Sequence, residues 1–166
     1  MRPRYFDFKL AALWAIFLIF AMTFAKLGSI DTLDTKFYYT AAEATKFFSS
    51  LNDKAAFHYL LVEIFDLGFI VVYITILYLS LKRVFYKVPK LKYFAVLPAA
   101  FDFFETKTVI ECLMASGPLP KDSLWLGYLT SAKWVTLGFL LLLFLIKFLK
   151  ITYMGLRLRF RNDTVH

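Results

Sequence analysis

Four carboxylic acids lie within stretches of sequence that are otherwise apolar. Glu63 and Asp66 belong to the run EIFDLGFIVVY, whereas Asp102 and Glu105 belong to the run LPAAFDFFETKTV. The members of each pair are three residues apart, which places them on one side of an α-helix. Carboxyl groups held in apolar surroundings can donate or accept protons near neutral pH. These four residues are therefore candidate catalytic acids and bases.

Lys133 is the candidate basic partner of these acids. It lies in the run LTSAKWVTLGF, and we expect its ammonium group to face Asp66 or Glu105. Besides Ser131, which could add a hydrogen bond, three further side chains could hydrogen-bond to the acids or to a ligand, and these are Thr130, Tyr73 and Trp134. Together with Lys133 they form the set of candidate ligand-binding residues.

A second lysine, Lys107, is expected at a similar depth. With Lys133 it gives two bases against four acids, so at least one carboxyl group is expected to be protonated. Lys107 also lies four residues before Glu111, on roughly the opposite helix face, where the two could form a local ion pair. Charge clusters of this kind occur in structural networks as well as in catalytic sites.

Long apolar segments must position these residues. The chain has 166 residues, of which 60% are hydrophobic and 20% aromatic, whereas soluble domains are about half apolar. Four runs reach the roughly 20 residues that a helix needs to cross a bilayer, and they cover about 10–30, 57–81, 93–116 and 124–149. We predict an all-α fold in which residues 1–166 form one membrane domain, a four-helix transmembrane bundle.

Lysine and arginine are distributed unequally between the ends of these runs. Thirteen flank the ends next to the N-terminus, the 82–92 connection and the C-terminus, whereas five lie at the opposite ends. The positive-inside rule then places both termini in the cytoplasm, and we expect the protein to lie in the cytoplasmic membrane. The 93–116 run must span for this distribution to hold, although each charge near a helix centre costs about 2.5–3.5 kcal/mol. A re-entrant or interfacial segment is the alternative.

The helical rise of about 1.5 Å per residue places the charges at similar depths. Counted along three different runs, the acids and lysines lie between about 9 and 16 Å below the outer membrane boundary. This agreement predicts one charged layer inside the bundle, where ionisable groups can pair or contact water.

The connection between the first two runs contains a helix-start signal. Thr40 and Glu43 have the spacing of a capping box, and apolar residues follow at helical spacing. We predict a short amphipathic helix over about 41–51, either on the outer membrane surface or across the end of the bundle. Simple packing is its ordinary role, and a gating lid is the alternative.

Several classes of function are disfavoured. The net charge of +8 does not predict nucleic-acid binding, because the basic residues lie between apolar runs rather than along one face. A single cysteine, Cys112, excludes an internal disulfide and a cysteine-based zinc site. His58 is more typical of an interfacial residue than of a metal ligand. We expect neither a metal nor a cofactor, and we interpret the N-terminal run as a retained span rather than a signal peptide.

The segments YTAAEATKFF, EIFDLGFIVVY, LPAAFDFFETKTV and LTSAKWVTLGF together resemble small bacterial four-span membrane proteins. That resemblance covers most of the chain and implies no chemistry. The chain is also similar to the EXPERA superfamily, the four-span fold of sterol isomerases and the sigma-2 receptor. There, Glu63 and either Asp31 or Asp34 would match the family's acidic residues, which implies a sterol or cationic amphiphile in an intramembrane cavity. Asp102, Glu105 and Lys133 have no assigned counterparts.

Three hypotheses about function follow. In the first, the bundle encloses a carboxylate-lined cavity that binds a membrane lipid, a sterol or another small hydrophobic ligand, and an enzyme of this kind would be an acid–base isomerase. In the second, the protein is an accessory or scaffold subunit whose charged layer stabilises helix packing within a homo-oligomer or against a membrane partner protein. The third, a proton- or ion-coupled transporter, is less favoured because no repeat is visible.

Overall fold

The computed structural model describes residues 8–27, 33, 36–115 and 119–163, with side chains left out at both ends of the first helix, at two isolated positions and beyond Tyr153. The described residues form helices and contain no strand. In chain order these are α1 (Phe8–Leu27), α2 (Ala41–Ser50), α3 (Asp53–Val84), η2 (Pro89–Ala95), α4 (Val96–Met114), η3 (Lys121–Trp125) and α5 (Leu126–Asp163), where η marks a 3-10 helix. The all-α prediction is confirmed.

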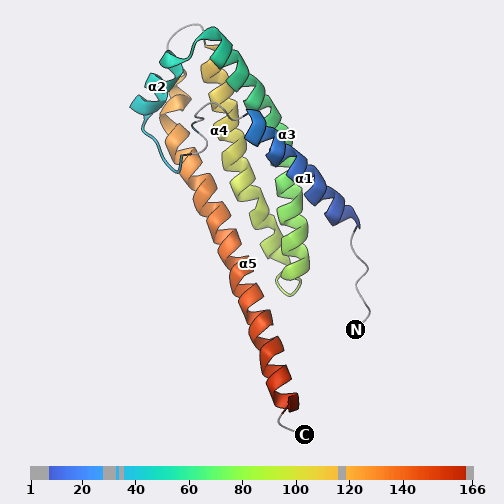
Figure 1. Cartoon of the computed structure of the whole chain (residues 1–166). Helices are drawn as coiled ribbons and strands as arrows, with labels where there is room; N and C mark the ends of the chain where they lie inside the picture. The colour runs from blue at the N-terminus through green and yellow to red at the C-terminus, as the bar shows by residue number, and fades with distance from the viewer. Residues whose placement is uncertain (1–7, 28–32, 34–35, 116–118, 164–166) are drawn as a thin grey trace.

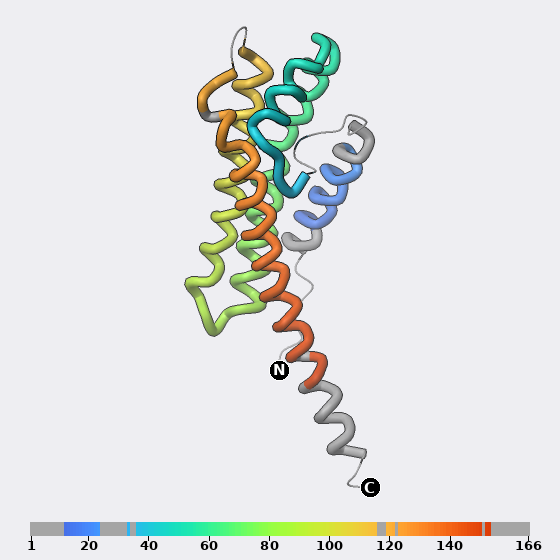
Figure 2. The backbone as a smooth tube through the Cα atoms, turned by 90° about the vertical axis from the view of Figure 1, so that its left-hand side faces the viewer, coloured from blue at the N-terminus to red at the C-terminus, as the bar shows by residue number. Residues whose placement is uncertain are grey.

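Helices α3, α4 and α5 lie side by side and run in alternating directions (Figure 1). Helix α1 packs against α3, and α2 lies near the end of the bundle where α3 begins (Figure 1). The beginning of α1, the α3–α4 connection and the end of α5 all lie toward the opposite end (Figure 1), and the coloured part of α5 already extends beyond the α3–α4 connection there (Figure 2). This is the up-and-down order that four successive membrane crossings would produce.

Among the described residues, two segments are long and apolar enough to cross a membrane, Asp53–Val84 and Ser123–Lys150. The described apolar part of α1, Ala12–Thr23, is shorter. Charged residues interrupt the apolar sequence of α4, and this helix begins only at Val96, after the 3-10 helix η2. Two of the four expected spans are thus supported by length and composition.

The predicted capping box of α2 is confirmed. The backbone N–H of Thr40 donates to Glu43 Oε2 at 2.7 Å, and the N–H of Glu43 donates to Thr40 Oγ1 at 3.2 Å. The hydrogen bond from the Thr40 backbone lowers the pKa of the Glu43 carboxyl group. Ala44 is buried, and the ring of Phe47 meets Tyr59 of α3 edge-on with centroids 5.6 Å apart. The amphipathic face of α2 therefore packs on the core of the bundle.

Aromatic contacts hold α1 on α3. The rings of Phe17 and Phe69 stack with centroids 5.1 Å apart, and Phe20 contacts both Phe65 and Phe69. Gly68 lies under this contact, because a Cβ atom at this position would come within 3.3 Å of the Phe20 ring. Phe17 and Phe20 are therefore packing residues between α1 and α3.

The segment that precedes α2 is fixed to the start of α5. The hydroxyl of Ser131 donates to the backbone carbonyl of Phe37 at 2.9 Å, and the Tyr38 and Tyr128 rings meet edge-on. Gly127 makes this approach possible, since a Cβ atom there would lie 1.9 Å from the Tyr39 carbonyl oxygen. A side chain at position 127 would force the segment away from α5.

We therefore expect Gly127→Ala to destabilise the protein by about 1–3 kcal/mol, the usual cost of overpacking, because neither backbone can move independently. Gly138→Ala is the matched control on the same helix, where an added Cβ meets nothing within 4 Å. That change should gain up to about 1 kcal/mol from helix propensity. Unfolding of the purified protein in detergent measures both effects. Equal stability of the two variants would contradict the close contact between residues 39 and 127.

Candidate functional site

The two acids of α4 and the lysine of α5 form a compact ion cluster. Lys133 Nζ lies 2.8 Å from Asp102 Oδ1 and 2.7 Å from Glu105 Oε2. The side chains of Lys133, Asp102 and Glu105 are 12%, 8% and 0% exposed. The expected contact between Lys133 and Glu105 is confirmed, and the second carboxylate found at the ammonium group belongs to Asp102.

Hydroxyl groups extend this cluster on both sides. Tyr73 of α3 donates to Asp102 Oδ2 at 2.8 Å. On the other side, Thr130 Oγ1 is hydrogen-bonded to Glu105 Oε1 and lies 3.3 Å from the Tyr39 hydroxyl. A continuous polar network therefore runs from Tyr39, before α2, through α5 and α4 to the middle of α3.

Thr130 can serve this network in two hydrogen-bonding arrangements, because its hydroxyl has one proton and several neighbours. It can donate to an ionised Glu105 while it accepts from Tyr39, or it can accept from a protonated Glu105 and donate to the Leu126 carbonyl, 3.0 Å away. Both arrangements satisfy the hydroxyl group. A change in the protonation of Glu105 would thus be accommodated without moving a helix.

The acids of α3 approach the same region through a different contact. Thr106, which follows Glu105 on α4, donates to Asp66 Oδ2 at 2.9 Å. Glu63 lies one turn from Asp66 on α3, and its side chain is fully buried. Asp66 therefore faces α4, and Asp102 faces both α3 and α5, whereas Glu105 is in contact with α5.

The remaining candidates lie at the edge of the network or outside it. Trp134 presents its ring 5.9 Å from Lys133 Nζ. Lys107 and Glu111 form an ion pair at 2.9 Å, with side chains that are 48% and 41% exposed. The local pairing is confirmed, whereas the placement of Lys107 in the charged layer is wrong, because this lysine is on the exposed face of α4. The predicted layer of two bases and four acids therefore includes one base, Lys107, that does not belong to it.

Two members of the network were not identified from the sequence. Thr106 could have been recognised as a hydroxyl residue next to Glu105 in an apolar helix. Tyr39 gives no local signal, because its position depends on the contact between its backbone and Gly127. Among the described residues, no three side chains of His, Cys, Asp or Glu gather as metal ligands would.

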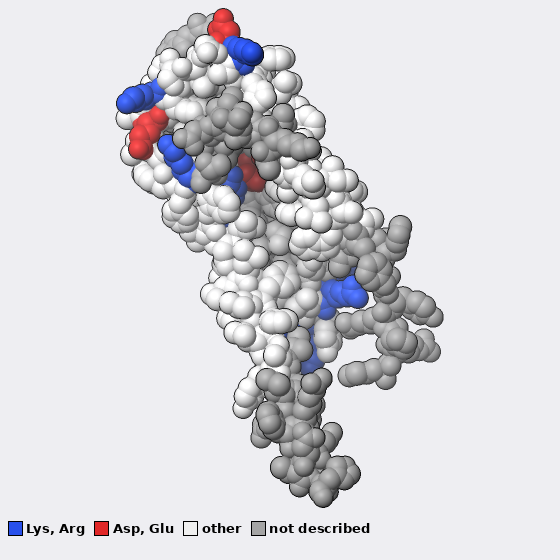
Figure 3. Space-filling model, viewed as in Figure 1, with Lys and Arg blue, Asp and Glu red and all other residues white. Residues whose placement is uncertain are grey.

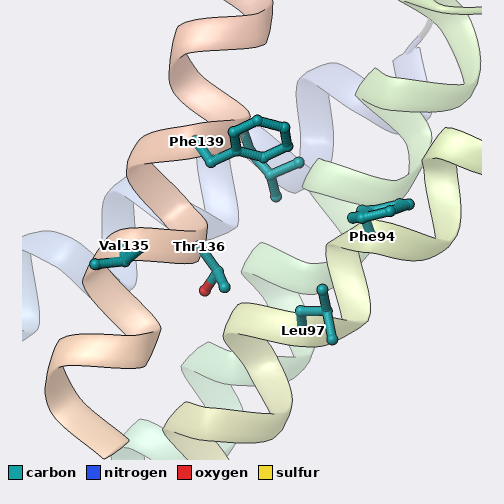
Figure 4. A pocket seen from close by; sticks show the side chains of 6 residues that line it. Phe94, Leu97, Val135, Thr136 and Phe139 are labelled. Carbon is teal, nitrogen blue, oxygen red and sulfur yellow. The ribbon is translucent and has the colours of Figure 1, made fainter. Parts of the chain in front are cut away.

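A separate hollow opens between α4 and α5. Its volume is about 220 Å³, and Figure 4 shows the side chains around it. The lining residues are Phe94, Leu97, Val135, Thr136, Phe139 and Leu140. The Thr136 hydroxyl donates to the backbone carbonyls of Ala132 and Lys133, so this wall is apolar in practice. None of the four acids lines this hollow.

Comparison with known proteins finds no matching family model, no matching characterised protein and no matching solved structure. The function is therefore argued from the geometry of the polar network and its surroundings.

Lys133 gives a direct test of the ion cluster. Lys133→Met keeps the length of the side chain but leaves two buried carboxyl groups without their cation, so we expect a loss of about 3–5 kcal/mol. Lys107→Met is the matched control, and it should cost no more than about 1 kcal/mol because its ion pair is exposed. Unfolding in mixed micelles measures both. Similar losses would show that the buried cluster contributes no more than the exposed pair.

Proposed function

We propose that this chain is a four-span integral membrane protein of the cytoplasmic membrane, with both termini in the cytoplasm. Its buried polar network would bind the polar group of a lipid-like or sterol-like ligand. The up-and-down order of α1, α3, α4 and α5 supports this topology, as does the distribution of lysine and arginine.

The surface chemistry of the helices supports the membrane assignment. Large apolar side chains are exposed on every one of the four helices, including Ile19, Val71, Phe103 and Leu142. Figure 3 shows most of the visible charged side chains toward the two ends, with a broad uncharged stretch between them. Soluble proteins rarely expose so much contiguous apolar surface. In α4, Asp102 and Glu105 face the interior while Phe103 and Phe104 face outward, which suits a crossing helix.

One observation carries the ligand proposal: the three side chains of the ion cluster differ in their solvent exposure. Glu105 is sealed, whereas Asp102 and Lys133 retain a small accessible edge beside Trp134. A hydroxyl or amine group of a ligand could hydrogen-bond to Asp102 at this edge, while its apolar body remained among the helices. In an isomerase, Asp102 would exchange a proton with the ligand, and Lys133 would compensate the changing charge.

A scaffold role is the second candidate, and it rests on a different feature of the same network. The contacts of Asp102 and Glu105 reach α3 through Tyr73 and α5 through Lys133 and Thr130. Such bonds fix the register of three helices, which would suit a subunit that assembles with copies of itself or with a membrane partner.

The topology is tested by cysteine labelling with a membrane-impermeant reagent. Lys46→Cys in α2 should react from outside intact cells, whereas Lys87→Cys, in the α3–α4 connection, should react only after permeabilisation. Both positions are exposed. Cys112→Ala serves as the common background, because it removes the chain's single native cysteine. The opposite pattern of labelling would overturn the orientation.

The ligand role is tested with Asp102→Asn and Glu105→Gln, which remove charge and preserve shape. We expect the lipid that remains with the purified protein, measured by mass spectrometry, to fall about tenfold or more. This is the loss that corresponds to one charge-assisted hydrogen bond. Glu111→Gln is the control on the same helix, where the carboxylate is exposed and paired locally.

The thermal midpoint of the same variants separates the two candidate functions. A large fall in midpoint with unchanged lipid retention would replace ligand binding by the scaffold role. Unchanged values of both would show that the carboxyl groups are solvated and contribute to neither function.

A further inference from the structure

The hollow between α4 and α5 plays no part in the function proposed above. Its walls are the start of α4 with the end of η2, and the middle of α5 (Figure 4). Thr136 is the only lining residue with a polar side-chain atom, and its hydroxyl group is already directed to two backbone carbonyls of its own helix. Such a lining offers an apolar chain good contacts and offers a polar ligand no hydrogen-bond donor.

Basic side chains lie on the two walls below this hollow, toward the end where α5 extends beyond its neighbours. Lys90 is in η2, four residues before the lining residue Phe94, which is about 8 Å along a 3-10 helix. Lys147 is on α5, eleven residues after Thr136, which is close to three full helical turns and therefore the same helix face. The Lys147 side chain is half-buried rather than fully extended into solvent. Both lysines would lie at the cytoplasmic boundary in the proposed topology.

Other basic groups nearby are less suited to bind a ligand at this position. Lys92 lies over the rings of Tyr78 and Tyr93, at 5.6 and 5.0 Å from their centroids. Its ammonium group is therefore held toward α3 rather than toward α5. Lys90 is thus the remaining lysine of η2, and Lys147 is the first lysine of α5 below the hollow.

We propose that this hollow binds an acyl chain of an anionic phospholipid from the cytoplasmic leaflet, with the lipid phosphate held between Lys90 and Lys147. Charge complementarity selects this occupant, because the hollow is apolar, no acidic residue lines it, and lysines follow it on both η2 and α5. The proposal depends on the membrane orientation proposed above, but it does not depend on ligand binding at the polar network.

The test uses the full-length protein in detergent, titrated with dioleoyl phosphatidylglycerol or with dioleoyl phosphatidylcholine. The thermal midpoint gives an apparent affinity for each lipid, because a ligand that binds the folded state stabilises it. We expect phosphatidylglycerol to bind more tightly, and soluble glycerol phosphate to have no effect, since it lacks the acyl chain. Equal stabilisation by the two lipids, or full stabilisation by glycerol phosphate, would overturn the proposal.

Lys147→Gln tests the phosphate contact without disturbing the core. It should weaken phosphatidylglycerol binding about fivefold, the ratio that one lysine near an anionic surface contributes. Phosphatidylcholine binding should not change. Lys121→Gln makes the same change at the other end of the bundle and should have no effect. Equal effects of the two variants would show that phosphatidylglycerol is attracted by the overall positive charge rather than by a specific site, and would overturn the proposal.

Leu97→Trp tests the apolar contact by filling the hollow, and it should weaken binding of both lipids. Leu141→Trp is its control, because Leu141 is exposed on α5 and does not line the hollow. Unchanged lipid binding in Leu97→Trp would exclude the hollow as the acyl-chain site. Loss of a cross-linked dimer in this variant, with lipid binding intact, would assign the hollow to a second copy of the chain instead.

Cysteine labelling separates the two proposals. Reversed labelling would remove the cytoplasmic boundary and with it both the topology and the lipid site. Labelling as expected, together with no preference for phosphatidylglycerol, would overturn the lipid site alone.

Discussion

The ion cluster of Asp102, Lys133 and Glu105 is the constraint on which the interior of this bundle depends. Moving a charge from water into a protein interior costs several kcal/mol, and only close, fully hydrogen-bonded partners offset that cost. Lys133 has two carboxylate partners within 2.8 Å, and Tyr73 and Thr130 hydrogen-bond to the outer oxygens of the same carboxylates. Any relative sliding of α3, α4 and α5 would break several of these bonds together. The cluster therefore sets helix register as well as local charge.

The segment that precedes α2 is coupled to this cluster through backbone packing. The carbonyl of Tyr39 lies where a Cβ atom of residue 127 would be, and the Ser131–Phe37 hydrogen bond holds the adjacent turn. The buried Tyr39 side chain can therefore reach Thr130, which contacts Glu105. Because α2 follows directly, its capping box and the buried cluster are two ends of one connected structure. A displacement of α2 would therefore be transmitted to Glu105 through the hydroxyl groups of Tyr39 and Thr130.

The sequence predicted those features that depend on local spacing. Asp102 and Glu105, three residues apart, lie on the same buried side of α4 and share Lys133, and the Thr40–Glu43 capping box forms as its motif indicates. Lys107 was misplaced because depth alone cannot determine which face of a helix a residue occupies. The contacts of Tyr39 could not be predicted, because they depend on close approach between segments that are distant in the chain.

The helix boundaries differ from the predicted ones for a related reason. The predicted segments are bounded by hydropathy, which marks the part of a helix that fits in a membrane. The helix itself ends where its backbone hydrogen bonds stop. Helix α5 accordingly continues to Asp163 rather than stopping near residue 149, and at 38 residues it is about 57 Å long, nearly twice an apolar bilayer core. At the other boundary, η2 occupies part of the predicted third run, so that Pro98 falls within the first turn of α4, where a missing N–H group costs little.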